Sequence, residues 1–369
     1  MRETVTLFLA GDVMTGRGLD QVLPYPVEPS LYEPGVWSAC DYVTMAENAN
    51  GAIPKPVAFE YPWGDALAEL DKRNVAARIV NLETAITVQN TPAPKGINYR
   101  MNPKNIPVIA AAGLSCCVLA NNHVLDWGRG GLLETLAALN DAGIRHAGAG
   151  RDLEQAAAPA AIPLSGGNRV LVFACGSETS GIPRDWGARR DRAGVHLLAD
   201  LSPQAVQVIA RQLRTVRRDG DVMIVSIHWG PNWGYGVSDM QRDFAHRLIE
   251  EGDVDIVHGH SSHHPIGIEV YKNRPILYGC GDFLNDYEGI GGYEAYHPEL
   301  ALMYLATIDT GARRLVRLEM IPFCVRNFRL GRASHADCTW LRDTLDREGR
   351  KLGTRVSLDA EDVLALGWA

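Results

Sequence analysis

Metal-capable side chains follow the apolar runs of this chain, at the points where those runs end. The runs cover residues 5–10, 77–82, 116–120, 222–227 and 254–257. The polar residues that follow them are Asp12, Glu83, Asn122, His123, His228, His258, His260, His263 and His264. In open α/β sheets, ligands bind in the crevice outside the carboxyl ends of the strands, so five such ends can converge on one crevice. The pattern therefore predicts a metal site.

The histidines are unusually crowded, because four of the eleven lie between residues 258 and 264. Protonated imidazoles this close together repel one another, which favours a cation or hydrogen-bonded carboxylates between them. A solvated histidine-rich loop is the plainer alternative. Asp12 could likewise cap a helix, and Asn122 could hydrogen-bond a turn. The polar residues at the other strand ends favour the metal site.

His123 stands three residues before Asp126. Two roles stay open for this pair. Asp126 either holds a histidine that lies behind the metal ligands, or fixes the tautomer of an acid/base group. Arg17 is either a surface charge or, if it lies near the crevice, a partner for a carboxylate or phosphate.

A glycine-rich, acidic segment at residues 279–289 contains Asp282, and His297 follows it. The segment is either an ordinary turn or part of the site. Trp229 lies beside a site motif, where it could line an aromatic subsite or simply pack in the core.

The apolar runs alternate with stretches at 103–112, 130–142, 203–218 and 239–251, whose apolar residues repeat at helical spacing. This alternation predicts an α/β fold with central sheets and outer helices, and the last strands should pair antiparallel. We expect a single domain over residues 1–330. Within it, residues 24–62 form a long, proline-rich, lid-like excursion. Residues 331–369 should add a C-terminal helical appendage.

Composition narrows the function classes. The chain has 369 residues, of which 46% are hydrophobic and 22% charged, as expected for a globular protein. Its formal charge of -8 disfavours nucleic acid or an anionic membrane surface as a partner. The apolar run at 108–120 is shorter than the roughly 20 residues that span a bilayer. We expect a cytoplasmic protein without a membrane anchor. Seven cysteines without a CxxC pair suggest neither a disulfide framework nor a zinc ribbon.

In these motifs the sequence resembles the CapA-like proteins, named for poly-γ-glutamate capsule synthesis, which are similar to calcineurin-like metallophosphoesterases. The resemblance runs from about residue 7 to 323 and rests on the motifs at 11–14, 81–84, 120–126, 228–230, 259–263 and 278–283. It implies a four-layer α/β/β/α sandwich of the metallo-dependent phosphatase type, with a two-metal site at the strand ends. The implied site residues are Asp12, the bridging Glu83, the ligands Asn122, His228, His260 and His263, and the catalytic His123.

The chain departs from the phosphoesterase pattern once. Where that family carries Asp-x-His, this chain has Met14 after Asp12, and a thioether is a poor ligand for a hard divalent ion. The loss of a nitrogen ligand favours a single ion with several waters, with Ca²⁺ or Mn²⁺ preferred and Zn²⁺ as a further candidate.

A surplus of histidine and aspartate beyond the needs of one ion favours acid/base chemistry on a peptide. The whole chain also looks like the CapA-like peptide epimerases of lasso-peptide biosynthesis, which invert one Cα from L to D in a ribosomally made precursor. This resemblance implies epimerisation near a peptide C-terminus. We expect Asp12 and His297 to act on one side of the Cα and His123 with Asp126 on the other, while Arg17, Trp229 and Asp282 bind substrate.

Two alternatives stay open beside the epimerase. One is a metal-dependent hydrolase of an amide or phosphoester. The other is a non-catalytic protein that holds a polyanionic peptide.

Overall fold

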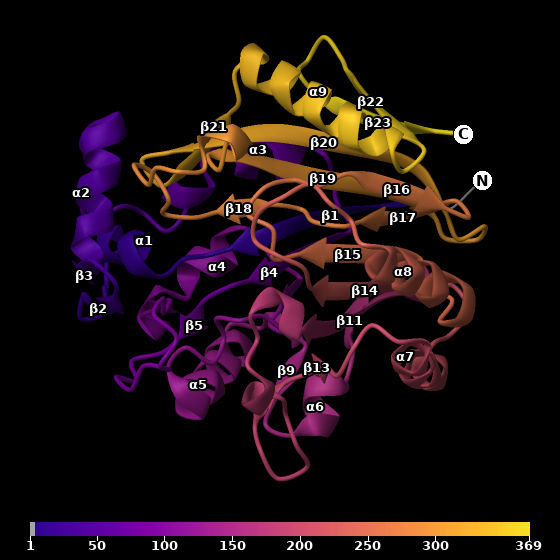
Figure 1. The fold of residues 1–369 in the computed structure, drawn as a ribbon, viewed down its shortest axis with the longest axis horizontal. Coiled ribbons are helices and arrows are strands. Elements are labelled where there is room, and N and C mark those ends of the chain that lie inside the picture. Colours follow the sequence, from indigo (N-terminus) through magenta and orange to yellow (C-terminus); the bar gives the residue numbers. More distant parts are fainter. Residues whose placement is uncertain (1–3) are drawn as a thin grey trace.

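The computed structural model describes residues 4–369 and contains two large β-sheets that lie face to face (Figure 1). The first sheet has ten strands. Its main path runs through β22 (Thr354–Leu358), β23 (Leu364–Trp368), β20 (Arg314–Arg326), β19 (Leu300–Asp309), β1 (Thr4–Val13), β4 (Ala77–Leu82), β7 (Cys116–Val118) and β8 (Arg145–Ala147). Two further strands pair outside this path, β18 (Asp282–Leu284) with β1 and β21 (Arg329–Arg332) with β20.

The second sheet has seven strands. Its path runs through β10 (Ala160–Pro163), β11 (Arg169–Ser177), β14 (Val222–His228), β15 (Ile256–His260), β17 (Arg274–Leu277) and β16 (Ile268–Tyr271), and β13 (Leu197–Leu198) pairs with β11. Three small two-stranded pairs lie outside both sheets: β2 (Ser30–Glu33) with β3 (Val36–Ser38), β5 (Ala85–Ile86) with β6 (Arg100–Met101), and β9 (Ala149–Gly150) with β12 (Gly194–Val195).

Helices flank the two sheets, most of them on the outer faces, whereas Leu341 and Leu345 of the last helix belong to the core cluster between the sheets. The helices are α1 (Arg17–Val22), α2 (Ala39–Asn50), α3 (Asp65–Lys72), α4 (Pro107–Ala111), α5 (Gly128–Asp141), α6 (Leu153–Ala157), α7 (Pro203–Val216), α8 (Asp239–Glu251) and α9 (His335–Arg350). Residues of α3, α4 and α5 pack with one face of β1 and β4, and residues of α7 and α8 pack with one face of β11 and β14. Figure 1 shows α7 and α8 beside β14 and β15.

A third core cluster fills the space between the sheets. Leu7, Leu9 and Ile79 from the first sheet meet Val172 and Ile224 from the second. Alternate residues of a strand point to opposite faces, so each central strand buries one set of side chains between the sheets and the other under the helices. These layers confirm the expected four-layer α/β/β/α sandwich.

Parallel pairing brings the site motifs to one edge. β1, β4, β7 and β8 run parallel, and so do β11, β14, β15 and β17. Asp12 lies in register with Asn81 and Asp282, and His228 lies opposite His260. The pairing of β1 is irregular on both sides of Asp12. There the chains approach so closely that a Cβ on Gly11 would lie 1.9 Å from the carbonyl oxygen of Gly281.

The expected helices are largely present. The stretch 203–218 forms α7, whose N-cap is Ser202, and 239–251 matches α8, which begins with a capping box between Ser238 and Gln241. The stretch 130–142 corresponds to α5, and 103–112 to a short 3₁₀ turn followed by α4. The last strands pair antiparallel, as the sequence predicted.

The C-terminal segment differs from expectation. Residues 331–369 contain α9, which begins with a capping box between Ser334 and Asp337, but they also contain β22 and β23. β23 pairs with β20, so this segment extends the ten-stranded sheet instead of forming a helical appendage. β22 and β23 are each only five residues long, and for this reason they gave a weak strand signal.

The excursion at residues 24–62 carries structure of its own, namely the β2–β3 pair and α2. Tyr42 of α2 lies over the Arg17 guanidinium, which anchors the excursion to the main body.

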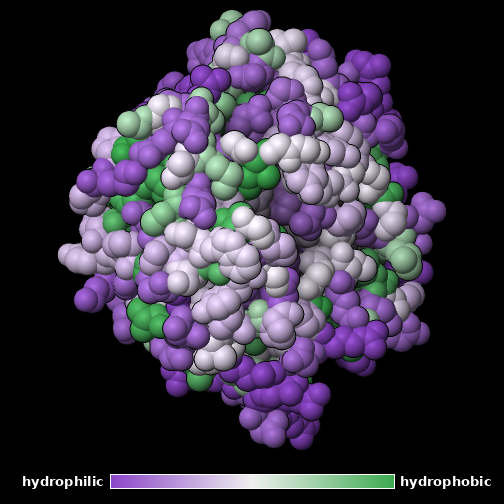
Figure 2. Space-filling model, turned by 60° about the vertical axis from the view of Figure 1, so that its left-hand side comes forward, coloured by the Kyte–Doolittle hydropathy of each residue, from purple (hydrophilic) through white to green (hydrophobic). Residues whose placement is uncertain are grey.

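The face of the molecule in Figure 2 is mostly hydrophilic, with hydrophobic residues in small scattered groups. Among residues 4–369, no helix is long and apolar enough to cross a membrane.

Candidate metal centre and active site

Two clusters of potential metal ligands meet at the carboxyl ends of β1, β14 and β15. The first consists of Asp12, His228 and His260, and the second of Asp12, His263 and Asp282. Within each cluster, one ligand atom per residue lies within 4.8 Å of the others, and all five residues are buried. Asp12 belongs to both clusters, so its carboxylate is placed to serve two positions.

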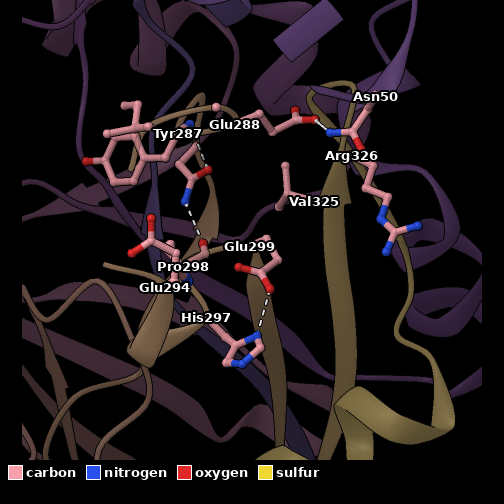
Figure 3. Close-up of a pocket in the computed structure, with 12 residues that line it drawn as sticks. Asn50, Tyr287, Glu288, Glu294, His297, Pro298, Glu299, Val325 and Arg326 are labelled. Carbon is pink, nitrogen blue, oxygen red and sulfur yellow. Dashed lines mark hydrogen bonds and ion pairs between the residues drawn. The ribbon is translucent and has the colours of Figure 1, made fainter. Parts of the chain in front are cut away.

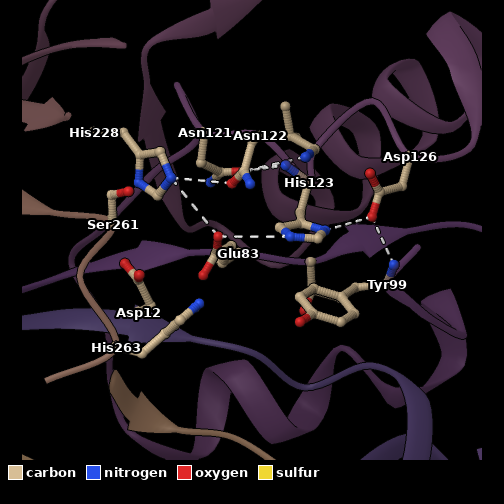
Figure 4. A network of polar contacts seen from close by, with 12 residues as sticks. Asp12, Glu83, Tyr99, Asn121, Asn122, His123, Asp126, His228, Ser261 and His263 are labelled. Atoms are coloured by element: carbon tan, nitrogen blue, oxygen red, sulfur yellow. Dashed lines mark hydrogen bonds and ion pairs between the residues drawn. The ribbon is translucent and has the colours of Figure 1, made fainter. Parts of the chain in front are cut away.

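Glu83 and Asn122 complete the first cluster. Glu83 Oε1 lies 3.7 Å from His228 Nε2, and Asn122 Oδ1 lies 3.0 Å from the same nitrogen (Figure 4). The five residues predicted as metal ligands therefore gather in one place: His228, His260 and His263 share a cluster with Asp12, and Glu83 and Asn122 contact His228.

The hydrogen bonds leave ligand atoms open. Asp12 Oδ1 accepts a hydrogen bond of 2.7 Å from Asn81 Nδ2, but its buried Oδ2 has no hydrogen-bond partner among the described residues. His228 Nδ1 and His260 Nδ1 lie only 2.8 Å apart. A buried carboxylate oxygen without a partner is costly unless something else satisfies it, and a cation does so.

The pKa shifts of these residues also favour a bound cation. Burial, together with the neighbouring Asp282, raises the pKa of Asp12 to about 7, and burial and Asp12 raise the pKa of Glu83 well above its usual value. Burial lowers the pKa of both His228 and His260 well below the usual value. Burial disfavours the charged form of every one of these groups, so ionised carboxylates are costly here unless a positive charge is bound between them. Divalent metal ions fit this donor set.

The mixture of donors bears on metal identity. Imidazole nitrogens suit Zn²⁺ and related transition metals, whereas carboxylate oxygens suit Ca²⁺ and Mn²⁺. The two clusters offer three imidazoles together with carboxylates, a donor set that several divalent ions share.

His123 stands beside the clusters as a separate acid/base group. Its Nδ1 lies 2.7 Å from Asp126 Oδ2, and its Nε2 faces Glu83 Oε1 at 3.8 Å. The ring of Tyr99 stacks on the imidazole at 3.9 Å. Burial lowers the pKa of His123 to about 4, although Asp126 opposes that shift. Because Asp126 accepts the Nδ1 proton, Nε2 is the free nitrogen that can take or give a proton.

A cavity of about 430 Å³ opens next to this arrangement. His123, Asn122 and His263 line it on the side of the clusters, and Trp233 and Tyr293 stack on each other at 4.0 Å in its wall. The cavity is large enough for a short segment of a peptide. The clusters of metal ligands, the acid/base residue His123 and the cavity together form a candidate active site.

Comparison with known proteins fixes the family. Residues 6–287 match the family described as bacterial capsule synthesis protein PGA_cap. This chain belongs to that family. A probable polyglutamine synthesis accessory protein of Mycobacterium tuberculosis is 47% identical over 364 residues, which cover 98% of this chain and 96% of the relative.

A more distant relative and a solved structure also match. The PGA biosynthesis protein CapA of Bacillus subtilis is 27% identical over 209 residues, 56% of this chain and 52% of that protein. A phosphatase structure from Mycoplasma pneumoniae superimposes with a TM-score of 0.49 at 12% identity, covering 88% of this chain and 95% of that one.

Two residues predicted for the site of this PGA_cap protein lie elsewhere. Trp229 is in the core of the second sheet, where its Nε1 donates to the carbonyl of Tyr278 at 2.9 Å, so the prediction that it binds substrate is wrong. His297 lies in a separate hollow of about 330 Å³, where its Nδ1 contacts Glu299 at 2.8 Å (Figure 3). The hollow and the cavity share Tyr287, Ile290 and Pro298 in their walls, but His297 lines only the hollow, so its position does not support the predicted catalytic role.

Arg17 and Asp282 reach the site in other ways than expected. Arg17 lines the cavity, but its guanidinium is buried and paired with Asp286 and Glu33. Its charge is therefore already compensated before any substrate binds. Asp282 lies in the second cluster, where its Oδ1 is 2.9 Å from His263 Nδ1, instead of on the cavity wall.

Sequence reasoning missed several residues of the PGA_cap site. Lys95 pairs with Asp126 at 2.9 Å and donates to the carbonyl of Asn122, and the hydroxyls of Tyr99 and Tyr287 lie 2.9 Å apart at the cavity. Lys95 and Tyr99 come from a loop without any repeating pattern, so no local signal marked them.

Proposed function

We propose that this protein is a metal-dependent hydrolase that cleaves amide bonds in a peptide or poly-amino-acid chain. One observation carries the proposal: His123, an imidazole oriented by Asp126, lines the same cavity as His263 of the second ligand cluster and Asn122 beside the first. A divalent ion bound there would lower the pKa of a water molecule toward neutrality and polarise the carbonyl under attack.

The residues of the chain supply the proton transfers. Neutral His123 accepts a proton from the attacking water at Nε2, while Asp126 stabilises the resulting imidazolium through Nδ1. The bond between the water oxygen and the carbonyl carbon forms, and the bond from that carbon to the amide nitrogen breaks. His123 then returns the proton to the leaving amine. One water is consumed, and an acid and an amine are released.

The names of two relatives support the proposed substrate class. The proteins similar to this chain are named for polyglutamine synthesis and for PGA biosynthesis, and both names describe chains of amide-linked amino acids. A cavity of about 430 Å³ admits only a short part of such a chain at a time. A peptide partner and a cytoplasmic location remain predictions.

Epimerisation of a peptide Cα is the second candidate, and a specific feature favours it. His123 and His263 both line the cavity, each in contact with one ring of the Tyr99–Tyr287 pair. Burial alone would lower the pKa of His263, but Asp282 raises it overall. Two imidazoles with opposite pKa shifts at separate positions of one cavity are the kind of acid/base pair that inversion requires. Inversion in a lasso-peptide precursor rests on sequence resemblance alone.

Incubation of the metal-loaded protein with glutamate oligomers and with unrelated peptides in heavy water distinguishes the reactions. Hydrolysis gives shorter chains and new amino groups, whereas epimerisation gives a gain of one mass unit without cleavage. His123→Asn should abolish either reaction without loss of bound metal. His196→Gln is the matched control, because His196 is a buried histidine that contacts the carbonyl of Ala174 outside the site. Intact, unexchanged substrate in every case would refute the enzymatic proposal.

A further inference from the structure

A buried line of polar side chains leads from the backbone of β1 to the first metal cluster. His258 Nε2 lies 2.9 Å from the carbonyl oxygen of Ala10, and His258 Nδ1 lies 3.0 Å from Ser226 Oγ. Ser226 Oγ in turn lies 2.9 Å from His260 Nε2. The three side chains are almost completely buried, and they link the two sheets at the level of the site.

The direction of every hydrogen bond in this series follows from the first one, between His258 and the carbonyl of Ala10. A backbone carbonyl only accepts, so His258 must donate from Nε2. His258 is buried and both of its ring nitrogens contact uncharged groups, so the ring is neutral and its Nδ1 is an acceptor. The hydroxyl of Ser226 therefore donates to His258, and its oxygen accepts from His260 Nε2.

This order fixes the proton on His260. With the hydrogen on Nε2, the neutral ring leaves Nδ1 as a bare lone pair. That nitrogen is the one that faces the cluster, 2.8 Å from His228 Nδ1 and 3.9 Å from Asp12 Oδ1. We propose that Ser226 and His258 are positioning residues that hold His260 in the tautomer whose Nδ1 binds the metal ion.

The hydrogen bonds that link His258, Ser226 and His260 determine which nitrogen of His260 is free to bind a metal ion. His260 in isolation could place its proton on either nitrogen, and a proton on Nδ1 would have to be lost before a metal ion could bind. The hydroxyl of Ser226 carries no charge. Its hydrogen bond with His260 therefore orients the imidazole and leaves it neutral. The inference concerns the metal centre on which the proposed function rests, and it is independent of which reaction the centre performs.

Direct titration of metal into the purified protein tests this role. Ser226→Ala removes the acceptor and should weaken binding of Mn²⁺ or Zn²⁺ by about 10- to 100-fold, the usual effect of losing a hydrogen-bond partner of a ligating histidine. Ser226→Thr retains the hydroxyl and should restore most of the affinity. His196→Gln, which changes another buried histidine on a backbone carbonyl, should bind metal as the wild type does.

The proton position provides a second readout that a merely structural role would not move. In the metal-free wild type, the nitrogen chemical shifts of isotope-labelled imidazole should show His260 protonated at Nε2, and Ser226→Ala should shift the population toward the Nδ1-protonated form. The proposal is overturned if wild-type His260 carries its proton on Nδ1, or if Ser226→Ala binds metal within twofold of the wild type. Normal metal binding without any turnover of substrate would count against the proposed hydrolase and leave the positioning role of Ser226 and His258 intact.

Discussion

Replacement of Asp12 by Asn should stabilise the metal-free protein at neutral pH, although Asp12 is a buried residue of the central strand. Burial and Asp282 raise the pKa of Asp12 to about 7 from a usual value of 3.8. The folded protein therefore binds this proton more tightly than the unfolded chain does. A group with a raised pKa in the folded state contributes stability at low pH, and that contribution is lost as the pH rises through the folded-state pKa.

The size of the effect follows from that shift. A difference of about three pKa units corresponds to about 4 kcal/mol of unfolding free energy, which ionised Asp12 costs the metal-free fold above pH 7. About 3 kcal/mol of this cost develops between pH 5 and pH 8. For a chain of this length, 4 kcal/mol corresponds to a shift in the melting temperature of about 5 °C. Asn at this position keeps an acceptor for Asn81 and carries no charge.

The assay is denaturant unfolding of both proteins in the presence of a chelator, at intervals from pH 5 to pH 8. The free energy of unfolding of the wild type should fall relative to that of Asp12→Asn as the pH rises. Added Mn²⁺ or Zn²⁺ should reverse the order, because the bound ion stabilises ionised Asp12 in the wild type and the variant lacks this ligand.

Two results would contradict this reasoning. If Asp12→Asn is less stable than the metal-free wild type by the same amount at every pH, then Asp12 is a structural carboxylate with a satisfied charge. If metal ions stabilise the variant as much as the wild type, then Asp12 is not a ligand.

Three further changes test other parts of the molecule. Asp126→Asn should lower turnover by about 10²- to 10⁴-fold and leave metal affinity within twofold, measured by steady-state kinetics and metal titration, because the carboxylate orients the acid/base imidazole without touching the clusters. Arg17→Lys should destabilise the protein by about 3 kcal/mol in denaturant unfolding, because an ammonium cannot span the two buried carboxylates that the guanidinium joins. Hydrogen bonds from Arg355 lower the pKa of Asp346, so its contribution to stability should be present at neutral pH and lost below about pH 4, and Asp346→Asn should remove that acid-dependent loss in a pH series of melting temperatures.

The sequence was most informative where metal-capable residues recur at strand ends. The carboxyl ends of parallel strands share an edge, so the positions of Asp12, Glu83 and His228 after apolar runs were enough to predict that they meet. The same rule fails for residues in loops. Trp229 and His297 stand near site motifs in the chain, but the direction of each side chain depends on packing that no local pattern records.

Ser226 shows a signal that was available and not used. It stands two residues before His228, as His258 stands two residues before His260, and residues two apart on a strand point to the same face. In the structure, Ser226 is in register with His258, and His228 with His260. Two neighbouring strands that each repeat a polar residue at this interval predict a polar ladder inside an otherwise apolar sheet. Lys95 has no comparable signal, because its position depends on the path of a loop.

The choice between hydrolysis and epimerisation depends on His263. A ligand histidine must present a bare nitrogen to the ion, whereas an acid that returns a proton to a Cα must carry one, so His263 cannot serve both purposes at once. If two ions bind, Asp12, His263 and Asp282 hold the second, and His123 is the remaining acid/base group, as hydrolysis requires. If only one ion binds, the His263–Asp282 pair stays free to face His123 across the cavity. The number of ions bound per chain therefore separates the two reactions before any substrate is known.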